Sequence, residues 1–243
     1  MSLADDAFAY FSPPRQRELL REWSSSRGMR FVEPGGGTAA GALEMLDRVG
    51  FRLLPVPKRH DVSLPVPVFE RGSARRVVHL VEGGGADQPR RVHWLSYRET
   101  ADGGDMETFN YTVVEHELPA EVAARFAGVA LYPRVHASPL RWFGARDDDR
   151  DVTLESVEFE QALRVRAMPG QDPIAVRELF APNRMLAMVR SLQEARHDIV
   201  PMWEQRGSCL AFIVAGHAIE AEPLDAALEA AALVRDTFLE EAR

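Results

Sequence analysis

The segment VTLESVEFEQALRVRAMPGQDPIAVRELFAPNRMLAMVRSLQEAR, residues 152–196, carries the most detailed pattern of secondary structure in the chain. Apolar and basic residues alternate from Leu163 to Ala167, which is the period-2 pattern of a half-buried strand. We therefore predict a strand over residues 159–168, ended by Pro169 and Gly170.

Two helices are predicted directly after this strand. Asp172 stands at an N-cap position and Pro173 at the first helical position, where the missing N–H of proline costs nothing. The first helix should run through Phe180. A second helix should begin at Pro182, and its apolar residues recur at helical spacing, so it needs a sheet or another helix to cover them.

The first half of the chain predicts an antiparallel meander. Residues 76–82, 91–98 and 109–118 are rich in β-formers, and the intervening segments contain the Gly and Asp residues typical of turns. A helix from Pro13 and a strand over residues 29–33 precede them. Gly35, Gly37 and Ala40 satisfy a loose dinucleotide-binding spacing, but the proline-rich stretch that follows offers no second parallel strand, so an ordinary loop is favoured.

The last part of the chain predicts strands over residues 199–205 and 209–215 and a final helix from Pro223. An apolar stripe along that helix predicts that Leu228 and Phe238 are buried. Together these elements indicate an α+β fold with two mainly antiparallel sheets covered by helices, and the sequence leaves open whether the sheets merge. The expected units are residues 1–136, a connection at 137–151 ending in a solvated acidic run, and residues 152–243.

Bulk composition restricts the class of protein. The 243 residues have a formal net charge of −8, which argues against nucleic acid as a general partner. The single cysteine, Cys209, cannot form an internal disulfide, and the N-terminal residues lack the pattern of a signal peptide. No apolar stretch is long enough to cross a bilayer. We therefore expect a cytoplasmic protein without membrane insertion.

Three pieces of the chain resemble a bacterial family of domains of unknown function. They are Phe69–Gly72 with the strand pair through Tyr97, the strand TVVEHELP at Thr112–Pro119, and residues 152–189, where Phe-Glu, a strand, an Asp and Ala-Val-Arg-Glu-Leu-Phe-Ala-Pro follow in order. The family has no established activity, cofactor or catalytic residues. The resemblance therefore implies an uncharacterised bacterial domain and carries over no functional residue.

Histidines on the three meander strands are the candidate metal ligands. Symmetric pairing of the first hairpin would place His79 opposite His93, and His116 would be a diagonal neighbour of His93 on the same face. Three imidazoles on one face could hold a zinc ion with an open fourth position, as in hydrolytic sites. The alternative is that each histidine is an ordinary half-buried strand residue.

A second candidate site is an aromatic and basic segment between the two halves. Trp142 and Phe143 are flanked by Arg141 and Arg146, which could form a protein-binding edge; the favoured alternative is that the aromatic rings anchor a linker in the core. Cys209 begins an apolar strand and is expected to be a small core residue. The favoured function is a non-catalytic module that binds a protein partner or forms a homodimer; the alternative is a metal-dependent hydrolase that uses the histidine trio.

Overall fold

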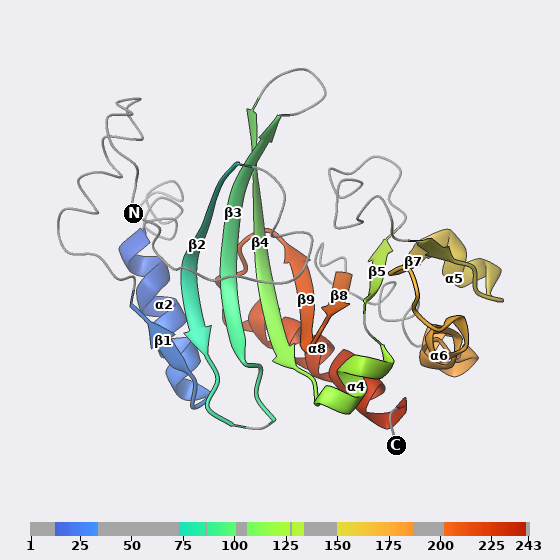
Figure 1. The fold of residues 1–243 in the computed structure, drawn as a ribbon. Coiled ribbons are helices and arrows are strands. Elements are labelled where there is room, and N and C mark those ends of the chain that lie inside the picture. The colour runs from blue at the N-terminus through green and yellow to red at the C-terminus, as the bar shows by residue number, and fades with distance from the viewer. Residues whose placement is uncertain are drawn as a thin grey trace.

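The computed structural model describes residues 13–33, 73–85, 87–100, 106–126, 128–133, 150–186 and 202–241. Its strands form a nine-stranded sheet in the order β1-β2-β3-β4-β9-β8-β5-β7-β6, and every neighbouring pair is antiparallel (Figure 1). The strands are β1 Arg30–Val32, β2 Ser73–Glu82, β3 Arg91–Thr100, β4 Met106–Glu117, β5 Val129–Pro133, β6 Arg150–Val152, β7 Leu163–Ala167, β8 Met202–Arg206 and β9 Cys209–Ala215. The helices with described bounds are α2 Pro13–Ser26, α4 Ala120–Arg125, α5 Val157–Ala162, α6 Pro173–Leu179 and α8 Ala221–Glu241.

The α+β class is confirmed, but the described strands form a single sheet rather than two. The two predicted sheets join where β4 pairs with β9, from Tyr111 opposite Ala215 to Glu117 opposite Cys209. The strand β9 is the sequence CLAFIVA, which is apolar at successive positions, as expected for a central strand buried on both faces. Such a run lacks the alternation of apolar and polar residues that marks a half-buried strand. The sequence of β9 alone therefore does not show which strands lie beside it.

The segment around β7 is partly as predicted. Strand β7 covers Leu163–Ala167, and its side chains alternate between buried and more exposed positions. The predicted start at residue 159 was wrong, because residues from Val157 form α5, whose N-cap Ser156 accepts a hydrogen bond from the Phe159 N–H. The expected cap of α6 is confirmed, since Asp172 accepts a hydrogen bond from the Ile174 N–H.

The acidic run before β7 also differs from the prediction. Residues 147–149 lie outside the described part, but Asp151 belongs to β6 and not to a loop. Its carboxylate accepts hydrogen bonds from the Arg164 guanidinium at 2.5 and 2.8 Å. The basic residues of the period-2 pattern therefore have an acidic partner on the neighbouring strand.

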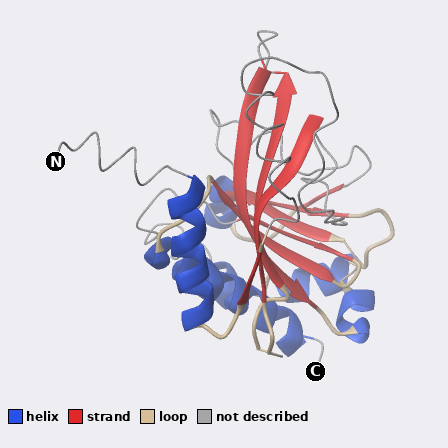
Figure 2. Ribbon diagram, turned by 90° about the vertical axis from the view of Figure 1, so that its left-hand side faces the viewer, coloured by secondary structure: helices blue, strands red, loops and turns tan. Residues whose placement is uncertain are grey.

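The described helices pack on one face of the sheet, which we call the helix face (Figure 2). Phe238 of α8 is buried there as predicted, whereas Leu228 is only half-buried. The Asp225 carboxylate of the same helix accepts a hydrogen bond from the Trp23 indole at 3.1 Å and pairs with Arg27. Helix α8 is therefore tied to α2 by a polar contact as well as by its apolar stripe.

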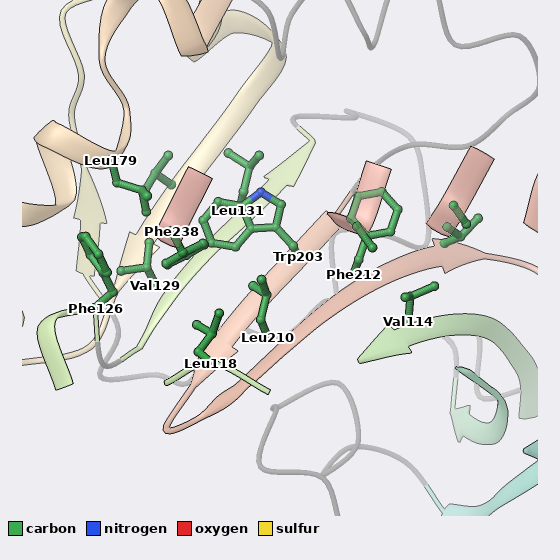
Figure 3. Packing of buried hydrophobic residues seen from close by; sticks show 14 of the residues in the cluster. Val114, Leu118, Phe126, Val129, Leu131, Leu179, Trp203, Leu210, Phe212 and Phe238 are labelled. Carbon is green, nitrogen blue, oxygen red and sulfur yellow. The ribbon is translucent and has the colours of Figure 1, made fainter. Parts of the chain in front are cut away.

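A chain of five aromatic rings forms the centre of the helix-face core. Phe238 packs edge-on against Phe126 and Trp203, with centroids 5.3 Å away in each case. Trp203 stacks on Phe180 at 5.9 Å, and Phe180 contacts Phe159 at 5.8 Å. Figure 3 shows Trp203 and Phe238 among the branched side chains of β5 and β9. The rings connect α4, α5, α6 and α8 to β8, so one cluster stabilises all of these elements.

The opposite side of the sheet, which we call the second face, has its own apolar cluster, formed by strand residues. Leu95, Val113 and Ile213 belong to it and are almost fully buried.

Among the helices that the structure describes, none is long and apolar enough to cross a membrane.

Candidate functional site

The predicted pairing of His79 with His93 is wrong by one residue. The hairpin begins with Glu82 opposite Arg91, one residue out of the predicted register, so that His79 lies opposite Trp94 and His93 lies opposite Leu80. Because side chains alternate across a strand, this shift puts the two imidazoles on opposite faces of the sheet. His79 contacts the Phe31 and Trp94 rings of the helix face, whereas His93 shares the second face with Leu95.

His116 lies on the helix face, two residues from Val114 of the same core. The next pairing places His93 opposite Val113, so His116 is not a diagonal neighbour of His93 on the same face as predicted. The structure therefore separates His93 from His79 and His116. Within the described ranges, no group of three or more His, Cys, Asp or Glu side chains is placed to hold a metal ion.

Burial keeps two of these histidines neutral. The pKa of His93 is lowered to about 3, first by burial and then by the positive charge of Arg91. The pKa of His116 is lowered to about 4, first by burial and then by Arg235, while Asp236 acts in the opposite direction. Neither side chain is in its protonated imidazolium form near pH 7, which is the form that acts as a general acid.

Cys209 is buried at the start of β9, as expected for a small core residue. Burial raises the pKa of its thiol well above the usual range, and the nearby carboxylate of Glu115 adds to this effect. The thiolate is the nucleophilic form of cysteine, so this side chain is held in its unreactive form.

The second face also carries a row of charged residues that runs across the whole sheet, one position from each strand. Cross-strand pairing links the positions in order: Arg30, Glu82, Arg91, Glu115, Ala211, Glu204, Ala130, Arg166 and Asp151. We call this set the charged row. Opposite charges are direct neighbours at each end, and the two alanines lie on either side of Glu204.

The most buried ion pair of the charged row joins Arg91 and Glu115. Their side chains are 17% and 1% exposed, and the guanidinium donates a 2.7 Å hydrogen bond to the carboxylate. Glu204 is fully buried and accepts a hydrogen bond from the Tyr132 hydroxyl. At the far end, Arg166 lies 3.5 Å from Asp151. These charges are paired or hydrogen-bonded in a way that suits structural polar groups.

The sequence prediction missed the charged row. Seven of the nine strands contribute one charge each, and such a charge looks like an ordinary solvent-facing residue when a strand is considered alone. The available signal was that Arg91 and Glu115 share the parity of apolar strand positions such as Leu95 and Val113. The register of β3 with β4 is also needed, because only the register shows that Arg91 lies opposite Glu115.

The other sequence candidates lie outside the described residues. These are Arg141, Trp142, Phe143 and Arg146 of the predicted protein-binding edge, together with the glycine loop at residues 35–37. The protein-binding edge therefore stays a prediction.

Comparison with known proteins gives one distant structural likeness. No family model matches the chain, and no curated protein matches it. The crystal structure of the mycobacterial trehalose monomycolate transport factor A, TtfA, is similar at a TM-score of 0.48 and 11% sequence identity, over 91% of this chain and 93% of that one. A likeness at this level carries no argument about function, and the resemblance to a bacterial family of unknown function stays a prediction.

Proposed function

We propose that the protein is a non-catalytic module that binds a protein partner or associates with itself. The observation that carries the proposal is the state of its candidate chemical groups. His93 and His116 are buried with pKa values of about 3 and about 4, and Cys209 is buried with a raised thiol pKa. Catalytic acids, bases and nucleophiles are instead expected to have a pKa near the working pH and a path to substrate.

The charged row supports the same proposal. Arg91 and Glu115 are in contact with each other and with strand neighbours on the buried second face. A buried pair of this kind fixes the register of a sheet more readily than it serves a substrate. In this proposal the buried charges of Arg91 and Glu115 stabilise the sheet. The surface of the molecule is then the part that recognises a partner.

A protein is the favoured partner on electrostatic grounds. The chain has a formal net charge of −8, which repels the phosphate backbone of nucleic acids. The predicted edge at Trp142 and Phe143 is one candidate contact. Light scattering after size-exclusion chromatography of the wild type and of Trp142→Ala/Phe143→Ala tests it: a lower mass in the variant supports the edge, whereas an unchanged mass with lost stability places both rings in the core.

Thiol chemistry tests the non-catalytic proposal directly. Cys209 in the folded protein should react with a disulfide reagent at pH 8 about 100-fold more slowly than in denaturant, because burial excludes the reagent and disfavours the thiolate. Ser208→Cys in a Cys209→Ala background is the matched control, since residue 208 is an exposed turn position. A native Cys209 that reacts as fast as this control would overturn the proposal.

A further inference from the structure

The hairpin formed by β3 and β4 extends beyond the rest of the sheet. The two strands pair from Arg91 opposite Glu115 to Thr100 opposite Met106. Strand β9 pairs with β4 only from Tyr111 onward. The five residues Met106–Asn110 therefore form a strand edge without a partner strand in the described structure, and Figure 1 shows this part of the hairpin projecting past the end of β9.

One hydrogen bond shows which backbone groups point away from β3 at this edge. The Asn110 carbonyl accepts a hydrogen bond from the Gly216 N–H, just beyond β9, at 2.8 Å. The N–H and C=O of a strand residue point to the same side in an antiparallel ladder, and the side alternates along the strand. Thr108 therefore directs its N–H and C=O outward, in the direction from which a further strand would approach.

The side chains along this edge suit an added strand. Phe109 stacks on Tyr97 at 5.4 Å, and Tyr97 stacks on Tyr111 at 5.9 Å, which makes a ladder of rings on the second face. Both tyrosines are buried, but Phe109 is only half-buried. Thr108 is exposed on the opposite side. An added strand would thus meet an apolar surface at one face and a polar surface at the other.

The regularity of this edge distinguishes it from the edge of β2, where a described neighbour is also lacking over part of the strand. Strand β1 pairs with β2 only at Leu80–Glu82, so the first part of β2 is also without a described neighbour on that side. That part of β2 contains two register irregularities, which twist a strand edge and discourage pairing. The pairing of β4 with β3 has an unbroken register over its ten residue pairs. Of these two edges, the β4 edge has the regular backbone that pairing with an added strand requires.

We infer that the edge of β4 around Thr108 binds an extended segment of a partner protein as an additional antiparallel strand. This inference rests on the proposed binding function. Five strand residues span only about 17 Å, whereas a stable dimer buries about 800 Å² on each partner. A short edge of this kind fits a peptide, which gains backbone hydrogen bonds and places alternate side chains in contact with the sheet.

The chemistry of the edge also defines the segment that it binds. The partner segment lacks proline, has apolar residues at alternate positions to pack on Phe109, and carries Lys or Arg near its ends. The basic ends complement the formal net charge of −8 of this chain.

The test uses a synthetic peptide with acetylated and amidated ends and the sequence Lys-Val-Thr-Val-Thr-Val-Lys. Amide chemical shifts of the ¹⁵N-labelled full chain should change at residues 108–110 during titration, and the Thr108 N–H should become protected from hydrogen exchange. The control peptide is methylated on alternate backbone nitrogens, which removes the donors of one edge, and it should not bind.

Thr108→Pro and Thr108→Val provide the matched variants. Proline removes an N–H that points outward, so pairing of β4 with β3 is preserved while strand addition is blocked. We expect Thr108→Pro to weaken peptide binding by about tenfold, because at least one backbone hydrogen bond is lost and the ring obstructs the approach. Thr108→Val retains the N–H and should bind within about twofold of the wild type. Unchanged amide shifts in β3 establish that each variant is folded.

Three results would overturn the inference. They are no shift changes at residues 108–110, equal binding by Thr108→Pro, and a wild-type dimer that Thr108→Pro converts to a monomer, which would make a second copy of the chain the occupant. None of these readouts depends on Cys209. A reactive Cys209 would instead overturn the non-catalytic proposal and leave the peptide result standing, so the two failures are distinguishable.

Discussion

The buried pair of Arg91 and Glu115 gives a quantitative test of the charged row. Replacing Glu115 by Gln keeps the shape of the side chain but removes its charge. Glu115 is 1% exposed and Arg91 is 17% exposed, so the remaining guanidinium would lose its hydrogen-bonded carboxylate in the interior. Breaking a buried pair in this way costs about 3–5 kcal/mol. Because the Gln oxygen can still accept a hydrogen bond, we expect about 3 kcal/mol.

Two further variants make this prediction specific. Glu117→Gln is the control, because Glu117 is 59% exposed and pairs with the half-exposed Arg90 at 3.4 Å. Its effect should stay within about 0.5 kcal/mol. The double variant Arg91→Met/Glu115→Leu removes both charges and should lose less than about 1.5 kcal/mol, because an apolar pair can replace a buried ion pair at little cost. Urea unfolding followed by tryptophan fluorescence measures all three free energies. Equal effects of Glu115→Gln and Glu117→Gln would refute the reasoning.

The remaining predictions concern pH, metal content and the aromatic core. The folded-state pKa values of His93 and His116 lie below the ordinary value, so the unfolded chain takes up protons first as the pH falls and stability is lost below about pH 6.5. Each histidine should contribute about 1.4 kcal/mol of loss between pH 7.5 and pH 5.5, and urea unfolding at both values that gave equal free energies would contradict this. Protein purified without chelator should contain substoichiometric zinc by elemental analysis, and one zinc per chain that disappears in His93→Ala would contradict the separation of the histidines. Trp203→Ala should cost about 3–5 kcal/mol, because the ring is central to the core, whereas Trp203→Phe should cost less than about 1.5 kcal/mol. The smaller cost is expected because the buried Trp203 N–H makes no hydrogen bond within the described structure. If Trp203→Phe lost as much unfolding free energy as Trp203→Ala, the indole N–H would contribute to stability.

Elements with local signals could be predicted from the sequence. Leu163–Ala167 has the alternation of a strand, and Asp172 with Pro173 has the composition of a helix start, and both were found as expected. The start of the strand was misjudged because Phe159 faces the core equally well from a helix. Side-chain burial alone does not distinguish a short helix from a strand at such a boundary.

Features that depend on register could not be predicted. The one-residue offset of the first hairpin, which pairs Glu82 with Arg91, has no local sequence signal, yet it moves His79 to the face opposite His93. The pairing of β4 with β9 joins segments about 100 positions apart in the chain and converts two expected sheets into one. The charged row depends on both, because the first register places Glu82 opposite Arg91 and the second places Glu115 opposite Ala211.

The most direct test of the central claim is a pH titration of the imidazole ¹⁵N resonances of His93 and His116. The claim is that these side chains are structural groups held neutral by burial, in a protein that acts through its surface. Because their pKa values lie at about 3 and about 4, both rings should stay neutral from pH 8 to pH 5 while the protein remains folded. A midpoint between pH 6 and pH 7.5 for either ring would show an accessible acid–base group and would contradict the account.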